Sequence, residues 1–102
     1  MKCVYIVKYD VYSIEDNNSE SFVEVFDSLE SATNYFEIKK EQILQEYCDY
    51  TDTDSIQDLM DNYDFDYDFK STVYGLSYAY LWLEDYGHDR LVIQKKDIMK
   101  FN

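Results

Sequence analysis

The residues of this chain that are best suited to chemistry are aspartates, and most of them lie between residues 49 and 69. This stretch reads DYTDTDSIQDLMDNYDFDYDF and contains no lysine or arginine. Asp54, Asp58 and Asp61 stand at i, i+4 and i+7, the spacing that places side chains on one face of a helix. The sequence therefore predicts a ridge of carboxylates opposite the apolar stripe of a short helix.

The second half of this stretch alternates carboxylates with aromatic rings. Asp64, Asp66 and Asp68 would lie on one side of an extended chain, about 6.6 to 6.8 Å apart, because a strand rises about 3.3 to 3.4 Å per residue. Such a row could occupy a groove of lysine and arginine that is built for phosphates. Tyr63 and Tyr67 would be contact anchors, since aromatic rings supply the stacking that bases offer in a nucleic acid. The predicted partner-binding site is these five residues together with the ridge.

The same carboxylates could instead bind calcium, because Asp64, Asp66 and Asp68 copy the opening of an EF-hand loop. The remainder of that loop is missing. Phe69 stands where the loop needs glycine, and Gly75 stands where it needs the final glutamate. We therefore predict no metal site and no cofactor.

Catalysis has few candidate residues in this sequence. His88 is the only histidine, and it falls in a predicted hairpin turn, where an exposed side chain is a poor general base. Cys3 and Cys48 have no base placed beside them by spacing, so we expect ordinary reduced cysteines rather than nucleophiles. No glycine-rich phosphate loop and no zinc ligand set occurs. We predict that the protein is not an enzyme.

The whole chain is strongly acidic. Its 102 residues include 22 Asp and Glu against 9 Lys and Arg, which gives a formal charge of -13. Direct binding to nucleic acid or to an anionic membrane is disfavoured, because affinity for phosphate comes from lysine and arginine. A basic partner is favoured instead. The alternative is an acidic surface that only keeps the protein in solution and has no partner.

Two further features concern the compartment. No apolar run approaches the roughly 20 residues that are needed to span a bilayer. The start MKCVYIV lacks the pattern of a secretory signal peptide. We therefore expect a reduced, cytoplasmic setting.

Hydrophobic periodicity predicts the elements that must position these residues. The predicted elements are strands at 3–12, 22–26, 72–83 and 90–94, helices at about 28–48 and 56–63, and an edge strand or extended loop at 64–69. Asp27 or Ser28 would cap the first helix, and Thr53 or Asp54 the second. The order ββααββ predicts an α+β fold, with an antiparallel sheet of about four strands and helices on one face. We expect a single domain over residues 1–102, with the first hairpin central to the fold.

In its size, its acid-only blocks, its many tyrosines and the run at 49–69, the chain resembles small acidic proteins that phages and mobile elements use against host defence. These include DNA-mimic anti-CRISPR and anti-restriction proteins. The resemblance implies a stoichiometric inhibitor that acts in the cytoplasm of an infected or lysogenic bacterial host. Its partner would be a basic nucleic-acid-binding protein, such as a CRISPR effector or a restriction nuclease.

A module that docks or dimerises through the aromatic side of its sheet is the alternative from a different class. Its contact residues would be Tyr74, Tyr78 and Trp82. Salt would then have little effect on binding, whereas it would weaken a complex that is held by charge.

Overall fold

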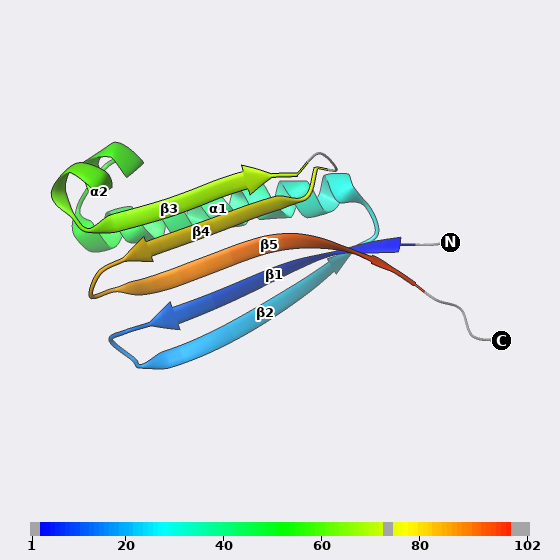
Figure 1. Ribbon diagram of the computed structural model, residues 1–102, viewed down its shortest axis with the longest axis horizontal. Coiled ribbons are helices and arrows are strands. Elements are labelled where there is room, and N and C mark those ends of the chain that lie inside the picture. The colour runs from blue at the N-terminus through cyan, green and yellow to red at the C-terminus, as the bar shows by residue number, and fades with distance from the viewer. Residues whose placement is uncertain (1–2, 73–74, 99–102) are drawn as a thin grey trace.

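Figure 1 shows the computed structural model, which describes residues 3–72 and 75–98. The elements in chain order are β1 (Cys3–Ser13), β2 (Asn18–Phe26), α1 (Leu29–Thr51), α2 (Ile56–Asn62), β3 (Phe65–Ser71), β4 (Ser77–Leu83) and β5 (Gly87–Asp97). The strands form one antiparallel sheet in the order β2-β1-β5-β4-β3. In the view of Figure 1, α1 lies behind β3 and β4, and no helix lies behind β2.

The predicted α+β class with an antiparallel sheet is confirmed, but the strand count and order are not. The sheet has five strands, because the alternating segment after α2 forms the edge strand β3. The first hairpin is also not central. β1 pairs with β5 on its second side, whereas β2 forms the opposite edge of the sheet. Neither α1 nor α2 is long and apolar enough to cross a membrane.

The predicted strand 72–83 begins later than expected, at Ser77. The Gly75 amide donates to the Thr72 carbonyl at 3.0 Å, and the Thr72 amide donates to the Leu76 carbonyl at 2.9 Å. Gly75 has a φ of +78°, a left-handed conformation that glycine adopts without steric cost. These contacts close the β3–β4 turn. Tyr74, which we expected on the aromatic side of the sheet, lies outside the described residues.

Serine side chains cap both helices. Ser28 Oγ accepts a hydrogen bond from the Ser31 amide at 3.2 Å, so the cap of α1 is Ser28. Ser55 Oγ accepts from the Asp58 amide at 3.2 Å, so the predicted cap at Thr53 or Asp54 is wrong. Each cap satisfies a backbone donor that the first turn of a helix leaves unpaired.

The core lies between α1 and the face of the sheet toward β4 and β5. Its buried apolar residues include Phe36, Ile43 and Tyr47 from α1 and Ala79, Leu81, Leu83, Leu91 and Ile93 from the sheet. Alternate residues of β4, among them Tyr78, Tyr80 and Trp82, point to the other side. We call this second side, which is turned away from α1, the open face.

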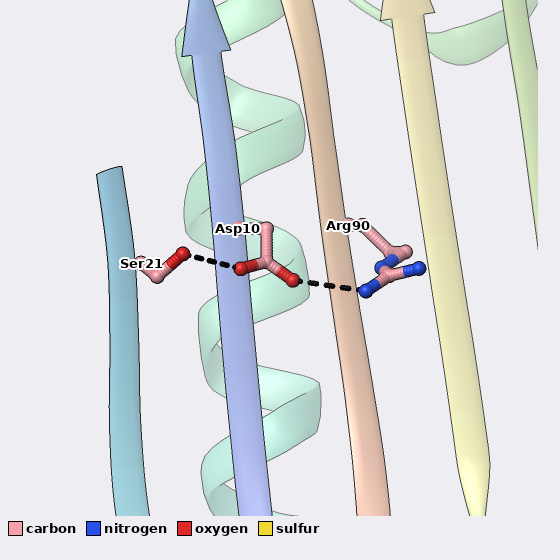
Figure 2. A network of polar contacts seen from close by, with 3 residues as sticks. All are labelled: Asp10, Ser21 and Arg90. Atoms are coloured by element: carbon pink, nitrogen blue, oxygen red, sulfur yellow. Dashed lines mark hydrogen bonds and ion pairs between the residues drawn. The ribbon is translucent and has the colours of Figure 1, made fainter. Parts of the chain in front are cut away.

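Asp10 joins three strands across the open face. Its carboxylate accepts a hydrogen bond from Ser21 Oγ of β2 at 2.6 Å and forms an ion pair with Arg90 of β5 at 3.1 Å. Figure 2 shows these side chains in front of the strands, with α1 behind. The Ser21 hydrogen bond, followed by the contact with Arg90, lowers the pKa of Asp10. The network ties the edge strand β2 to the middle of the sheet.

Candidate functional site: an acidic end of the molecule

Two hairpin turns, the end of α1 and the whole of α2 lie at one end of the molecule, at the left of Figure 1. The registers Ser13↔Asn18 and Leu83↔Gly87 place the β1–β2 and β4–β5 turns at the same end of the sheet. The Ile14 amide donates to the Tyr86 carbonyl at 3.0 Å, which ties the two turns together. We call this region the acidic end. Its carboxylates are Glu15, Asp16, Asp49, Asp52, Asp54, Asp58, Asp61, Asp64, Glu84 and Asp85.

Tyrosine rings connect these segments. Tyr86 of the β4–β5 turn lies against two rings of α1, with centroid distances of 4.9 Å to Tyr47 and 4.4 Å to Tyr50. The Tyr63 hydroxyl donates to the Thr51 carbonyl at 3.0 Å and so fixes the end of α2 against the end of α1. Tyr50 and Tyr63 remain 57% and 44% exposed. The acidic end therefore presents aromatic surface among its carboxylates.

Charge is concentrated here without compensation. The segments 14–17, 49–64 and 84–86 contain no lysine or arginine. A hydrogen bond with Asp64, together with the charges of Asp64 and Asp85, raises the pKa of Glu84. Along β5, the first cation from this end is Arg90, which is already paired with Asp10. The end is therefore a compact source of negative potential.

The lysines of α1 are also engaged elsewhere. Lys39 Nζ lies 5.0 Å from the centroid of the Tyr9 ring. Lys40 Nζ lies 5.1 Å from the centroid of the Phe69 ring and 2.8 Å from the Glu37 carboxylate. Both lysines therefore lie against rings beside the middle of α1.

The predicted ridge on α2 is only partly present. Asp54 precedes the helix, because the cap is Ser55, and its amide donates to Asp58 Oδ2 at 3.4 Å. Asp58 lies in the first turn of the helix, where a carboxylate interacts favourably with the helix dipole. Asp61 accepts from Gln57 Nε2 at 2.8 Å. The carboxylates of Asp58 and Asp61 are thus carried by the helix, while Asp54 lies beside its start.

The predicted row on β3 is divided between two places. Asp64 precedes the strand and belongs to the acidic end, and its carbonyl accepts from the Glu84 amide at 3.1 Å. Asp66 and Asp68 follow along the open face, where Asp68 forms an ion pair with Lys70 at 3.0 Å. Tyr67 points to the opposite side of the strand, where its ring centroid lies 6.0 Å from that of Phe65. It therefore does not lie beside Asp66 and Asp68 as an anchor.

The geometry also bears on the chemistry that the carboxylates could perform. Residues 65–71 form a strand and do not wrap around a cation as an EF-hand loop does, so Asp64, Asp66 and Asp68 do not open such a loop. Within residues 3–72 and 75–98, no group of three or more His, Cys, Asp and Glu side chains is arranged to hold a metal ion. His88 lies in β5 and not in the turn, and its ring stacks on Tyr12 at a centroid distance of 5.3 Å.

Sequence reasoning missed the contribution of the hairpin turns to this site. Glu15, Asp16, Glu84 and Asp85 were not among the expected site residues, although each lies in a connection between two strands. Their convergence follows from the pairing of β1 with β5, which no local pattern encodes. In the sequence, Asp89 alternates with the apolar residues Leu91 and Ile93, a pattern from which its burial could have been predicted. Asp89 is 3% exposed.

No protein-family model, no curated protein and no solved structure matches this chain. Its function must therefore be inferred from the geometry of the acidic end and of the sheet.

Proposed function

We propose that the protein mimics a nucleic-acid backbone and blocks the basic groove of a nucleic-acid-binding protein with its acidic end. The observation that carries this proposal is the convergence of carboxylates from separate chain segments, with no lysine or arginine in any of them. Like charges held this close repel each other and lower stability. A surface needed only for solubility would intersperse lysines among them.

A basic groove offers such a surface a favourable partner, because docking neutralises the repelling charges and releases the counterions of both proteins. The exposed rings of Tyr50 and Tyr63 can fill the places where bases would stack. Given the resemblance to anti-CRISPR and anti-restriction proteins, the target class that we propose is a defence nuclease of a bacterial host. The protein would act by stoichiometric occupancy, without catalysis or cofactor.

The observed positions of Asp66, Asp68 and Tyr67 require a narrower form of the proposal. The contact surface centres on the acidic end, with Asp61, Asp64 and Asp85 as exposed carboxylates from different segments. Asp66 extends this surface along the open face, whereas Asp68 is partly neutralised by Lys70. Tyr67 is directed away from it.

A second candidate function is docking through the open face. Tyr78, Tyr80 and Trp82 of β4 lie there without a covering helix, and the Tyr80 ring centroid is 6.3 Å from that of His88. Aromatic side chains of this kind are common anchors of protein interfaces. Binding through this face would be nearly independent of salt.

The proposed function is tested by capture from a bacterial lysate. Tagged protein is incubated with the lysate at about 0.15 M salt, and bound proteins are released by a salt step or by competing double-stranded DNA. We expect a nucleic-acid-binding protein that both treatments release. With the captured protein purified, a variant carrying Asp61→Asn, Asp64→Asn and Asp85→Asn should bind about tenfold more weakly, from about 0.5 kcal/mol for each exposed charge.

The matched control removes the same charge away from the acidic end, with Asp27→Asn, Glu30→Gln and Glu41→Gln, all of which are exposed. This control should bind like the wild-type protein. Equal weakening in both variants would show that only net charge matters. A partner that neither salt nor DNA releases would support the open face instead.

A further inference from the structure

β2 is an edge strand whose open face carries no charged side chain. It pairs with β1 on one side only, and the pairing runs through every residue from Tyr5↔Phe26 to Ser13↔Asn18 without a bulge. Unpaired backbone amides and carbonyls of an edge strand can pair with another strand, so proteins commonly guard such edges with lysine, proline or a bulge. Residues 18–26 contain no lysine, arginine or proline, and their two charged side chains, Glu20 and Glu24, lie on the side of α1.

β2 also exposes apolar side chains on both of its faces. Val23 and Val25, on the open face, are 54% and 60% exposed. Phe22, on the side of α1, is 49% exposed and stacks on Tyr9 at a centroid distance of 5.8 Å. At the end of the strand a helix residue reaches it, where the rings of Phe26 and Tyr35 lie 5.3 Å apart.

The open face of the other edge strand differs from that of β2. β3 carries Asp66, Asp68 and Lys70 on its open face, and charged side chains in these positions disfavour pairing with another strand. Its opposite face is covered by rings, with Phe69 beneath Lys40 of α1. An open face without charge is therefore a property of the β2 edge and not of both edges.

We propose that a second copy of this chain pairs with β2 in antiparallel orientation, so that two five-stranded sheets join into one continuous sheet about a two-fold axis. An isologous contact of this kind uses the same strand from both copies. It satisfies the free backbone groups of both edges and removes the exposed valines from water.

Charge and apolar contact together favour one register for this pairing. In a two-fold pair that keeps both open faces on the same side, the axis must pass through a single residue position, because side chains alternate between faces. Centred on Val23, the opposed pairs are Val23–Val23, Val25–Ser21, Phe22–Glu24 and Phe26–Glu20. Centring on Phe22 would oppose Glu24 and Glu20, and centring on Glu24 would oppose two glutamates. Like charges directly opposite each other are destabilising. Centring on Ser21 also avoids them but opposes Val23 with Ser19, and centring on Val25 pairs only residues 24–26 within β2. The Val23 register, which brings two exposed valines together at the axis, is therefore preferred.

The antiparallel orientation also separates the two acidic ends. The acidic end lies at the Asn18 end of β2, next to the β1–β2 turn. In the proposed dimer it therefore lies at the far end from its counterpart, along molecules whose longest extent is 56 Å. Charges separated by far more than the Debye length of about 8 to 10 Å are largely screened. Both acidic ends stay free in this dimer.

Sedimentation analysis over a range of protein concentrations tests the proposal. We expect a reversible dimer whose dissociation constant falls as salt rises from about 0.05 to 0.5 M, because salt screens the residual repulsion between two acidic chains. The opposite salt dependence is expected for a basic partner at the acidic end, so the two proposals can fail separately. A wild-type protein that stays monomeric throughout would overturn the dimer.

Two valine substitutions locate the interface. Val23→Lys with Val25→Lys should raise the dissociation constant by more than about tenfold, because like charges then oppose each other across the axis. Ile38→Lys is the matched control, since Ile38 of α1 is also exposed, at 61%, and lies outside β2. Both variants reduce the net negative charge, so loss of the dimer in the first alone supports the β2 edge. A dimer that survives in the first variant, or is lost equally in both, contradicts it.

Cysteine cross-linking determines which residues of the two β2 strands lie opposite each other. In a Cys3→Ser background, Val23→Cys should form an intermolecular disulfide on mild oxidation, because directly opposed residues have Cα atoms about 4.5 to 5.5 Å apart. Val25→Cys should not, because its counterpart lies about four residues, or roughly 13 Å, further along the strand. Cross-linking of the Val25→Cys variant without cross-linking of the Val23→Cys variant would contradict the proposed register.

Discussion

Asp89→Ala is expected to lower the free energy of unfolding by about 2 to 4 kcal/mol. Asp89→Asn, in contrast, should retain most of the wild-type stability. Asp89 is 3% exposed, and its carboxyl group accepts hydrogen bonds from the Tyr9 hydroxyl at 2.5 Å and the Tyr47 hydroxyl at 2.6 Å. Alanine removes the carboxyl group that accepts from both tyrosines, so the Tyr9 hydroxyl loses this hydrogen-bond acceptor. Tyr47 keeps the Leu81 carbonyl, at 3.1 Å, as an alternative acceptor.

The number of protons available at this site explains why Asp89→Asn is expected to retain most of the stability. The Tyr47 hydroxyl has one proton but faces two acceptors, Asp89 Oδ2 and the Leu81 carbonyl. If Asp89 is protonated, it can donate to Tyr47, and Tyr47 can then donate to Leu81. Asparagine reproduces this pattern, because its amide nitrogen donates to Tyr47 while its oxygen accepts from Tyr9. The neutral side chain also avoids the burial of a charge.

The same residue predicts a pH dependence of stability. Burial raises the pKa of Asp89, although its hydrogen bonds with Tyr47 and Tyr9 oppose this shift. Because the folded state then holds the proton more tightly than the unfolded state, stability is highest below the ordinary aspartate pKa. It falls as the pH rises through the raised value. Relative to the wild-type protein, Asp89→Asn should therefore gain stability as the pH rises from about 4 toward neutrality.

Urea unfolding followed by circular dichroism between about pH 4 and 8 measures these differences. Asp10→Asn is the control of opposite sign, since the pKa of Asp10 is lowered by Ser21 and Arg90. The stability that ionised Asp10 contributes is present above the ordinary aspartate pKa and is lost as the pH falls through the lowered pKa of the folded state. An Asp89→Asn protein as unstable as Asp89→Ala would contradict the proton arrangement described above.

Gly87→Ala is expected to lower the free energy of unfolding by about 2 to 6 kcal/mol, from overpacking together with backbone strain. Gly87 has a φ of +147°, and a Cβ atom there would lie 2.0 Å from the Tyr12 carbonyl oxygen and 3.1 Å from its carbon. Both are backbone atoms of the neighbouring strand, so no side chain can move to make room. β1 and β5 would have to separate where Ser13 pairs with Gly87.

Gly75→Ala is the matched control for this substitution. Gly75 also has a positive φ, of +78°, but an added Cβ would meet only Leu29 Cδ2, at 3.3 Å. The end of a flexible side chain can shift, so the expected cost is about 1 kcal/mol, from backbone conformation. Thermal unfolding of both variants gives the comparison. Equal losses would show that contact with β1 at Gly87 is not the cause.

The Gly87 substitution also has a functional consequence. Gly87 directly follows the turn that carries Glu84 and Asp85, and this turn is tied to the β1–β2 turn through Ile14 and Tyr86. Separation of β1 from β5 would therefore disperse the carboxylates of the acidic end. Under the proposed function, Gly87→Ala should weaken binding to the captured partner even at temperatures where the variant remains folded.

Several features of this protein follow from local sequence patterns. Alternation of apolar and polar residues predicts β1, and the apolar stripe of residues 29–47 predicts α1. The alternation at 64–69 indicates an edge strand or an extended loop, and the structure has the strand β3 there. These patterns are reliable because neighbouring residues in a strand or helix share one periodic backbone geometry. The acid-only blocks and the net charge of -13 need no structure at all.

Other features depend on contacts between residues far apart in the chain. Pairing of β5 with β1, rather than local alternation, makes β2 an edge and gathers both hairpin turns beside α2. It also buries Asp89 against Tyr9 and Tyr47, residues 80 and 42 positions away along the chain. Periodicity tells which side of a strand is apolar but not which strand lies next to it. The chain alone therefore determined its acidity and the approximate positions of most elements, while strand pairing determined where the carboxylates meet and which edge remains open.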